Sequence, residues 1–122
     1  MGEKIDMRDS IPKFLQGVFP FVGAGYENPC VISDALSYMV PADRRTQPIY
    51  FRGGNSSGEM IFVVLTRDGV PMRWFPIGAR SGTHVPLAVV EDLMPDTKVE
   101  LRLGAQSGAT GVVMIDFGMV EI

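Results

Sequence analysis

The chain has 122 residues, a length that suits one domain and leaves no room for two. Its formal net charge is −3 and no run of Lys or Arg occurs, so we expect neither nucleic acid nor an anionic membrane surface as a partner. The single cysteine, Cys30, excludes an intramolecular disulfide. Because the N-terminus is charged and no apolar run approaches the length of a membrane span, we expect a cytoplasmic protein.

Residues 1–16 admit two interpretations. Ser10 ahead of Pro12 fits the N-cap of one short N-terminal helical turn, because Ser caps helices and Pro suits a first turn. An extended N-terminal arm fits the same residues equally well. The following segment, 17–23, is apolar but contains Pro20, which favours a strand at a sheet edge.

Strand signals dominate the middle of the chain. Thr46–Arg52 fits a short strand, and the Gly, Asn and Ser residues of 53–58 predict a loop. Met60–Thr66 gives the strongest strand signal, since it is β-branched and aromatic with no helical period. Asp68-Gly69 separates it from Val70–Phe75, which predicts a β-hairpin with a type I′ turn because glycine tolerates positive φ.

The segment that ends at Pro95 is ambiguous. Thr83–Val90 predicts a further strand, and Pro86 places that strand at an edge or a bulge. Glu91–Met94 then fits a helical turn closed by the proline. A helix over Leu87–Met94 is the competing interpretation, because short apolar runs do not distinguish strand from helix.

The last fifth of the chain, residues 98–122, contains two strand signals separated by a loop signal. Lys98–Leu103 predicts a strand, residues 104–111 a Gly-, Ser- and Thr-rich loop, and residues 112–122 a final strand. The inward residues of the first of these strands are Val99, Leu101 and Leu103. Many short strands with hardly any helix predict a single all-β domain over residues 1–122, an antiparallel β-sandwich or jelly roll.

Two predicted strands are apolar on both faces. Met60–Thr66 carries Met60, Phe62 and Val64 on one face and Ile61, Val63 and Leu65 on the other. The final strand carries Val113, Ile115 and Phe117 opposite Val112, Met114 and Val120. Since an antiparallel sandwich normally solvates one face of each sheet, the N-terminal arm, a loop or another subunit is expected to cover the second face. A homo-oligomer is the favoured interpretation.

Aromatic and arginine side chains gather around the predicted hairpin and mark a candidate ligand-binding face. Trp and Arg are typical anchors of recognition surfaces, and aromatic rings also stack on sugars. Trp74 as a simple core residue is the alternative. The predicted ligand-binding residues are Tyr50, Arg52, Arg73, Trp74, Arg80 and His84.

The candidates for acid–base chemistry are His84 and Asp116. His84 can act as a general base beside Glu91 or Asp92, although a surface histidine is the plainer interpretation. Asp116 lies within an apolar strand, and a buried carboxylate needs a cationic partner. The candidate partners are Arg73, Arg80 and Arg102. One His and one Cys do not make a metal cluster, so we expect no metal and no cofactor.

The segment Asn55–Leu93 contains a loop, a strand, the pattern Asp-x-x-Pro over Asp68–Pro71, a second strand and an apolar stretch ending in Asp92-Leu93. In this order it is similar to small bacterial β-sandwich proteins such as the sensory rhodopsin transducers. The resemblance covers about a third of the chain. It implies a soluble cytoplasmic oligomer that binds a protein or a small ligand.

Three functions remain open on the sequence. The leading hypothesis is a non-catalytic, oligomeric β-sandwich module that binds a protein partner or a small ligand, because catalytic motifs are missing and two strands are apolar on both faces. The second is a structural subunit of a larger assembly, such as a phage or shell component. The third is a small hydrolase- or isomerase-like enzyme that uses His84 with a nearby carboxylate.

Overall fold

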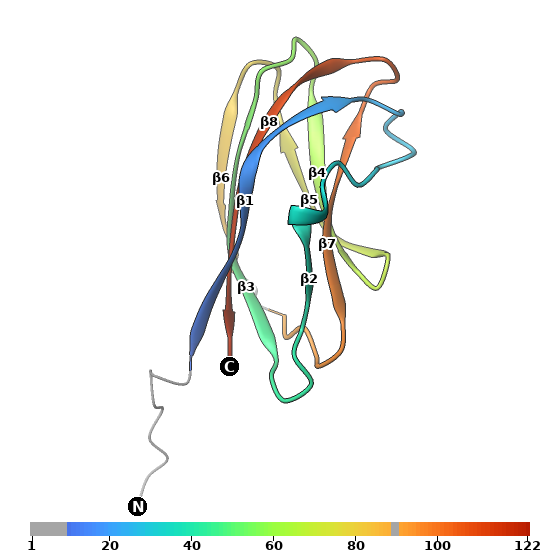
Figure 1. Cartoon of the computed structure of the whole chain (residues 1–122). Helices are drawn as coiled ribbons and strands as arrows, with labels where there is room; N and C mark the ends of the chain where they lie inside the picture. Colours follow the sequence, from blue (N-terminus) through green and yellow to red (C-terminus); the bar gives the residue numbers. More distant parts are fainter. Residues whose placement is uncertain (1–9, 89–90) are drawn as a thin grey trace, which may run out of the picture.

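The computed structural model describes residues 10–88 and 91–122 and shows two antiparallel sheets packed face to face (Figure 1). Sheet A has the strand order β1-β8-β3-β6, and sheet B the order β2-β7-β4-β5. The strands are β1 (Ile11–Val22), β2 (Ser37–Met39), β3 (Thr46–Asn55), β4 (Ile61–Arg67), β5 (Val70–Ile77), β6 (Gly82–Pro86), β7 (Lys98–Ala105) and β8 (Thr110–Glu121). The predicted all-β sandwich is confirmed, and in the described part of the chain no helix is long and apolar enough to cross a membrane.

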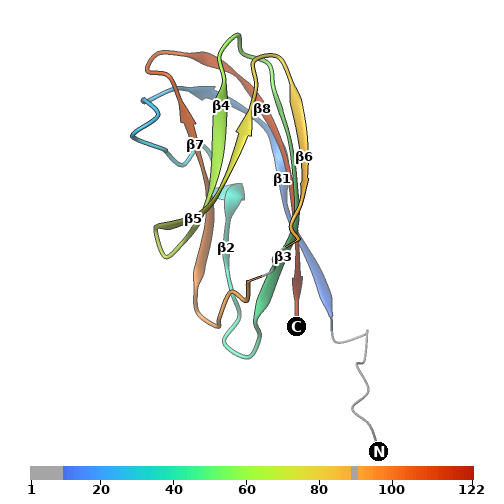
Figure 2. The same cartoon turned by 180° about the vertical axis from the view of Figure 1, so that it is seen from behind.

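The core lies between the two sheets, which the reverse view shows on either side of the interior (Figure 2). Alternate residues of each central strand point into it because successive side chains of a strand face opposite ways. The rings of Phe51 and Phe75 stack across the two sheets, with centroids 4.3 Å apart. The predicted inward residues of β7, Val99, Leu101 and Leu103, are buried. In β4 and β8, which are apolar on both faces, the face that turns to the core consists of Ile61, Val63, Leu65, Val113, Ile115 and Phe117.

The predicted hairpin turn joins β4 and β5. Asp68 has φ of 50° and Gly69 has φ of 82°, so both central residues take the positive φ that a type I′ turn requires. The Asp68 carboxylate also accepts a hydrogen bond from the Lys98 backbone N–H at 2.9 Å, which ties the turn to β7.

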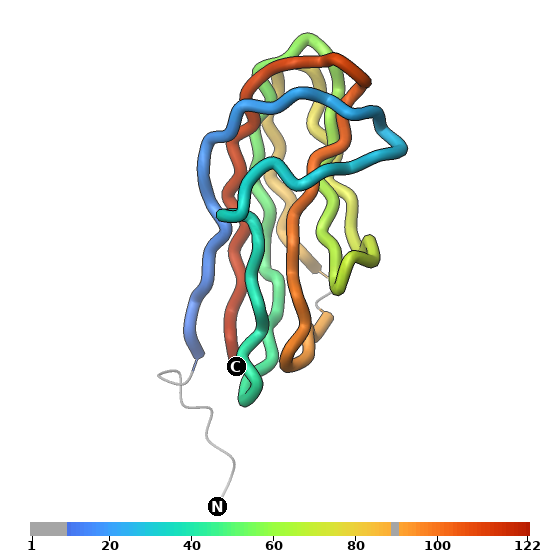
Figure 3. The backbone as a smooth tube through the Cα atoms, turned by 45° about the vertical axis from the view of Figure 1, so that its right-hand side comes forward, coloured from blue at the N-terminus to red at the C-terminus, as the bar shows by residue number. Residues whose placement is uncertain are grey.

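The N-terminal segment is one long edge strand, so the predicted helical turn after Ser10 is wrong. Leu15 and Phe21 are both buried, and their positions differ by an even number, so the two side chains lie on the same face of a strand, the face that packs on the core. β1 pairs with β8 from Ile11 to Val22, and Figure 3 shows its blue tube beside the red tube of β8. Residues 1–9 of the predicted arm lie outside the described residues.

The segment before Pro95 contains a short strand and no helix in its described part. β6 ends at Pro86, so the predicted continuation of the strand through Leu87 and Ala88 is wrong, and residues 89–90 lie outside the described residues. The helical turn predicted over Glu91–Met94 is wrong, because Leu93 exchanges two backbone hydrogen bonds with Thr46, at 2.7 Å and 2.9 Å. The competing helix over Leu87–Met94 is absent from residues 87, 88 and 91–94.

Two glycine-rich segments predicted as loops are partly strand. β3 continues through Gly53 and Gly54 to Asn55, and β7 continues through Gly104 to Ala105. Gly104 makes room for a neighbouring ring, because a Cβ built on it would lie 2.2 Å from the Phe62 ring. Composition alone therefore misread residues that are glycine because of packing.

Candidate functional site

Four side chains form one polar row across the outer face of sheet A, one from each strand. In the register of the sheet, Gln16 of β1 lies opposite Asp116 of β8. Asp116 lies opposite Arg52 of β3, and Arg52 lies opposite His84 of β6. The row therefore joins residues that are far apart in the sequence.

Asp116 is the centre of this row. Its carboxylate accepts hydrogen bonds from Gln16 Nε2 at 2.8 Å, Tyr50 Oη at 2.9 Å, and Arg52 Nη2 and Nε at 2.6 Å and 3.1 Å. Partial burial raises the pKa of the Asp116 carboxyl, but these hydrogen bonds outweigh it and hold the pKa below its usual range. The predicted need for a cationic partner is confirmed. The partner is Arg52 because it lies directly opposite in the register, so the predicted partners Arg73, Arg80 and Arg102 were wrong.

His84 lies on the same face as Asp116 but is separated from it by Arg52. Its ring stands edge-on to Tyr50, with centroids 6.3 Å apart. The other carboxylates expected beside it are engaged elsewhere: Glu91 pairs with Arg73, and Asp92 accepts from Gln47 at 2.7 Å and pairs with Arg45 at 3.5 Å. The acid–base pair considered from the sequence is therefore not assembled as a hydrogen-bonded pair.

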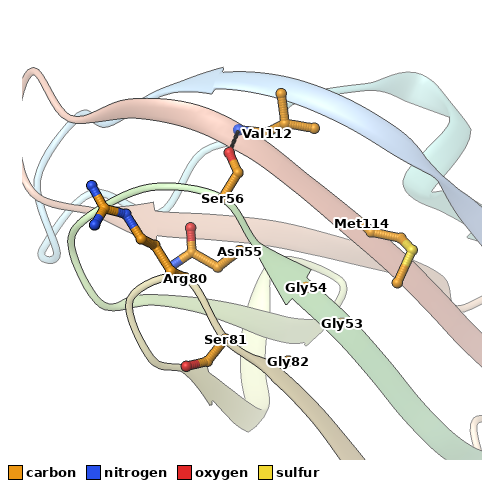
Figure 4. Close-up of a pocket in the computed structure, with 9 residues that line it drawn as sticks. All are labelled: Gly53, Gly54, Asn55, Ser56, Arg80, Ser81, Gly82, Val112 and Met114. Atoms are coloured by element: carbon orange, nitrogen blue, oxygen red, sulfur yellow. Dashed lines mark hydrogen bonds between the residues drawn. The ribbon is translucent and has the colours of Figure 1, made fainter.

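An open depression of about 480 Å³ lies beside the polar row on the outer face of sheet A. Gly54 and Gly82, which are register partners, form part of its lining because neither carries a side chain. Figure 4 shows Met114 at one end of the depression and Arg80, in the turn between β5 and β6, at the other. Ser56 Oγ accepts a hydrogen bond from the Val112 backbone N–H at 2.8 Å and closes the upper rim.

Trp74 lies on the opposite side of the molecule, on the outer face of sheet B. It is 56% exposed, so the interpretation of Trp74 as a core residue is wrong. Its register partner on β4 is Val64, which is buried, and Arg102 of β7 lies on the far side of Val64. The outer face of sheet B therefore carries a half-exposed indole beside a buried valine.

Two aromatic residues that the sequence did not single out share this face. The ring of Tyr26, from the segment after β1, stacks on Phe62 of β4, with centroids 6.2 Å apart and planes 21° apart. The Tyr26 hydroxyl donates to the Met60 carbonyl at 2.6 Å and fixes the segment over the sheet. The expectation that a loop covers the second apolar face of this strand is thus confirmed for Phe62. The alternation of β4 placed Phe62, but nothing in the sequence placed Tyr26.

Trp74, Phe62 and Tyr26 are together called the aromatic strip. Trp74 and Phe62 sit diagonally across β5 and β4, since Phe62 pairs with Pro76 and Trp74 with Val64. Diagonal neighbours of this kind are about 7–8 Å apart, within reach of large rings. The strip therefore brings together rings from three segments of the chain.

A charged pair flanks the aromatic strip on β7. Arg102 Nε donates to Glu100 Oε1 at 2.8 Å, and Ser37 Oγ donates to Glu100 Oε2 at 3.2 Å. Burial raises the pKa of the Glu100 carboxyl, but the hydrogen bond and charge of Arg102, with Ser37 and Lys98, hold it below its usual range. The carboxylate is thus ionised at neutral pH beside an apolar surface.

The six predicted ligand-binding residues fall in three places. Tyr50, Arg52 and His84 meet on the outer face of sheet A, with Arg80 at the end of that face. Trp74 is on the outer face of sheet B, and the Arg73 side chain pairs with Glu91 and donates to the Met72 carbonyl at 3.0 Å. Within residues 10–88 and 91–122, no three or more His, Cys, Asp or Glu side chains are grouped to hold a metal ion.

No family model and no curated protein sequence matches this chain. Solved structures do match its fold. The CBM36-1 domain of a multidomain xylanase from the hindgut metagenome of Trinervitermes trinervoides is 18% identical over 90% of this chain and 96% of its own, with a TM-score of 0.58. A carbohydrate-binding module CBM36, solved in complex with calcium and xylotriose, is 24% identical over 69% of this chain and 70% of its own, with a TM-score of 0.53. The chain shares their β-sandwich fold.

Proposed function

We propose that this protein is a non-catalytic module that binds carbohydrate along the aromatic strip of sheet B. The observation that carries the proposal is the 56% exposure of Trp74 on an open sheet face, beside the stacked rings of Phe62 and Tyr26. An exposed indole offers a rigid apolar surface with one polar N–H. The C–H face of a sugar ring suits that surface.

The surroundings of the strip suit the hydroxyl groups of a sugar. Arg102 uses its Nε on Glu100, and its guanidinium carries further N–H donors. The strip lies along the surface of a sheet, and such a surface accommodates an extended chain better than a single small molecule, which needs a concave pocket. We therefore propose an oligosaccharide or polysaccharide as the ligand.

The structural comparisons support this ligand class. Both similar structures are named as carbohydrate-binding modules, and one of them holds xylotriose. The same structure holds calcium, whereas the described residues of this chain provide no carboxylate cluster for such an ion. We propose that sugar binding here needs no metal.

The test uses the fact that Trp74 is the only tryptophan of the chain. Titration with xylotriose, and with a panel of other oligosaccharides, is expected to shift its fluorescence. Calorimetry on Trp74→Ala is expected to show at least a tenfold loss of affinity, and Phe14→Ala, which removes an exposed ring from sheet A, none. Unchanged affinity in Trp74→Ala would overturn the assignment.

We also propose that the module acts as a homo-oligomer, through a face other than the aromatic strip. The enzyme hypothesis finds less support. His84 is not hydrogen-bonded to any of its three candidate carboxylates, and Arg52 separates it from Asp116.

A further inference from the structure

The outer face of sheet A exposes an unusual amount of apolar surface. Five large hydrophobic side chains of β1 and β8 are between 40% and 66% exposed: Phe14, Val18, Val22, Val112 and Met114. The outer face of an antiparallel sheet is normally polar, and a contiguous apolar patch marks an interaction site. The second apolar face of β8 is therefore not covered within the described chain.

In two neighbouring rows of residues on this face, the side chains of β1 and β8 differ from those of β3 and β6. One row differs in charge and the other in side-chain size. The polar row places its acid, Asp116, on β8 and its fixed base, Arg52, on β3. The next row places large side chains on β1 and β8 and glycines on β3 and β6: Val18, Met114, Gly54 and Gly82. A line between β8 and β3 thus divides acid from base and ridge from hollow.

We propose that two copies of this chain pack face to face through the outer faces of sheet A, related by a two-fold axis. The axis lies between the two copies, parallel to the strands and above the line between β8 and β3. This axis places β8 over β3 of the second copy and β1 over β6 of the second copy. Residues of one row then face residues of the same row. Asp116 faces Arg52 of the second copy, and Met114 faces Gly54 of the second copy.

Each of these contacts is complementary, and the two-fold axis makes each of them twice. Met114 enters the depression of about 480 Å³ that Gly54 and Gly82 leave open. The Arg52 side chain is 56% exposed although it pairs with its own Asp116, so its guanidinium has donors left for the second carboxylate. Opposite charges and a ridge over a hollow argue for a second copy rather than an unrelated partner.

The size of the face suits a dimer. Strands of about ten residues at about 3.3 Å per residue, four abreast at about 4.8 Å, give an area of about 600 Å² for each copy. Two such faces bury about 1,200 Å², the lower end of the range for specific interfaces. The dimer leaves both aromatic strips on its two outer surfaces, where, if the proposed function holds, it would join two polysaccharide chains.

Sedimentation velocity of the full chain tests the interface. We expect a dimer at micromolar concentration, weakened at least tenfold by Met114→Lys, which places a charge in the apolar contact. Met39→Lys is the matched control, since Met39 is equally exposed on β2 of the other sheet. Gly54→Val fills the hollow, and its Cβ meets nothing closer than 3.7 Å, so that variant is expected to fold and yet to be monomeric. A monomeric wild type, a dimer that survives both variants, or an open-ended polymer would overturn the proposal.

A charge swap tests the geometry. The double variant Arg52→Asp/Asp116→Arg restores opposite charges both within a copy and across the axis, so it is expected to dimerise. In a mixed dimer with the wild type, two carboxylates would face each other across the axis, and so would two guanidinium groups. Native mass spectrometry of the mixture is therefore expected to show two homodimers and few heterodimers, whereas free mixing would contradict the proposed axis. Neither result depends on sugar binding, so this inference and the proposed function fail separately.

Discussion

The guanidinium of Arg52 donates two hydrogen bonds to one oxygen of Asp116, at 2.6 Å and 3.1 Å, from the position directly opposite on the neighbouring strand. Charge-assisted bonds of this kind are among the stronger ones in proteins. They join β3 to β8 on the outer face of sheet A, and Gln16 extends the connection to β1. The pair therefore ties together three strands and, in the proposed dimer, marks the two-fold axis.

The Asp116→Asn variant tests the role of this carboxylate in stability. Because the pKa of Asp116 is lowered on folding, its contribution is present above the unfolded pKa of about 3.9 and is lost as the pH falls through the lower folded pKa. We expect the variant to lose on the order of 1 kcal/mol of unfolding free energy at pH 7, and the difference from wild type to shrink towards pH 2. Urea unfolding over this pH range measures it, and an equal difference at every pH would contradict the account.

Tyr38 makes the stability of the fold depend on pH in the alkaline range. Burial raises the pKa of Tyr38 to about 12, helped by the hydrogen bond to buried Glu121. The folded state then holds a proton that the unfolded chain loses near pH 10, so the stabilisation is complete below pH 10 and is lost between about pH 10 and 12.

Tyr38→Phe is expected to remove this part of the alkaline loss. At pH 7 the variant lacks the hydroxyl that donates to Glu121, and its free energy of unfolding is expected to be lower by about 1–3 kcal/mol. Denaturant unfolding at pH 7 and at pH 11 compares the two proteins. If their difference in unfolding free energy did not narrow at the higher pH, the assignment of the titration to Tyr38 would be wrong.

Gly104→Ala probes the packing under the aromatic strip. The added Cβ would lie 2.2 Å from the Phe62 ring, so Phe62 and the Tyr26 ring stacked on it must move. We expect the free energy of unfolding to fall by about 1–3 kcal/mol, which is typical of overpacking, and sugar binding to weaken. Thermal unfolding and calorimetric titration measure the two effects. Gly54→Ala, whose Cβ would make only ordinary contacts with Met114 at 3.7 Å and 3.8 Å, is the control and is expected to leave sugar binding unchanged.

Removal of metal ions tests whether the proposed sugar binding depends on calcium. The described residues hold no cluster of ligating side chains, so the affinity for oligosaccharide is expected to be the same in EDTA as in millimolar calcium. Parallel titrations under the two conditions provide the comparison. A loss of binding in EDTA that calcium restores would show that metal ligands had been missed.

The fold was predictable where local chemistry decides it. Alternation placed the inward residues of β7, and Asp68-Gly69 placed the hairpin, because period and turn type are properties of neighbouring residues. Gly104 was misread because it makes room for the Phe62 ring, which comes from another strand. Local signals do not contain that information.

The candidate sites were less predictable for the same reason. The need of Asp116 for a cation followed from its apolar neighbours, but Arg52 lies 64 residues away and becomes its partner only through the strand order. Tyr26 reaches Phe62 from an irregular segment, which has no period to read. Trp74 was identified by residue type, and only the register showed that it and His84 belong to different faces.

The most direct test of the proposed function is the NMR signal of the one indole N–H, that of Trp74, during addition of xylotriose and related oligosaccharides to ¹⁵N-labelled protein. The account predicts that this signal shifts together with backbone signals of β4, β5 and the segment around Tyr26, while those of β1 and β8 stay in place. Shifts confined to the outer face of sheet A, or no shift with any oligosaccharide, would contradict it.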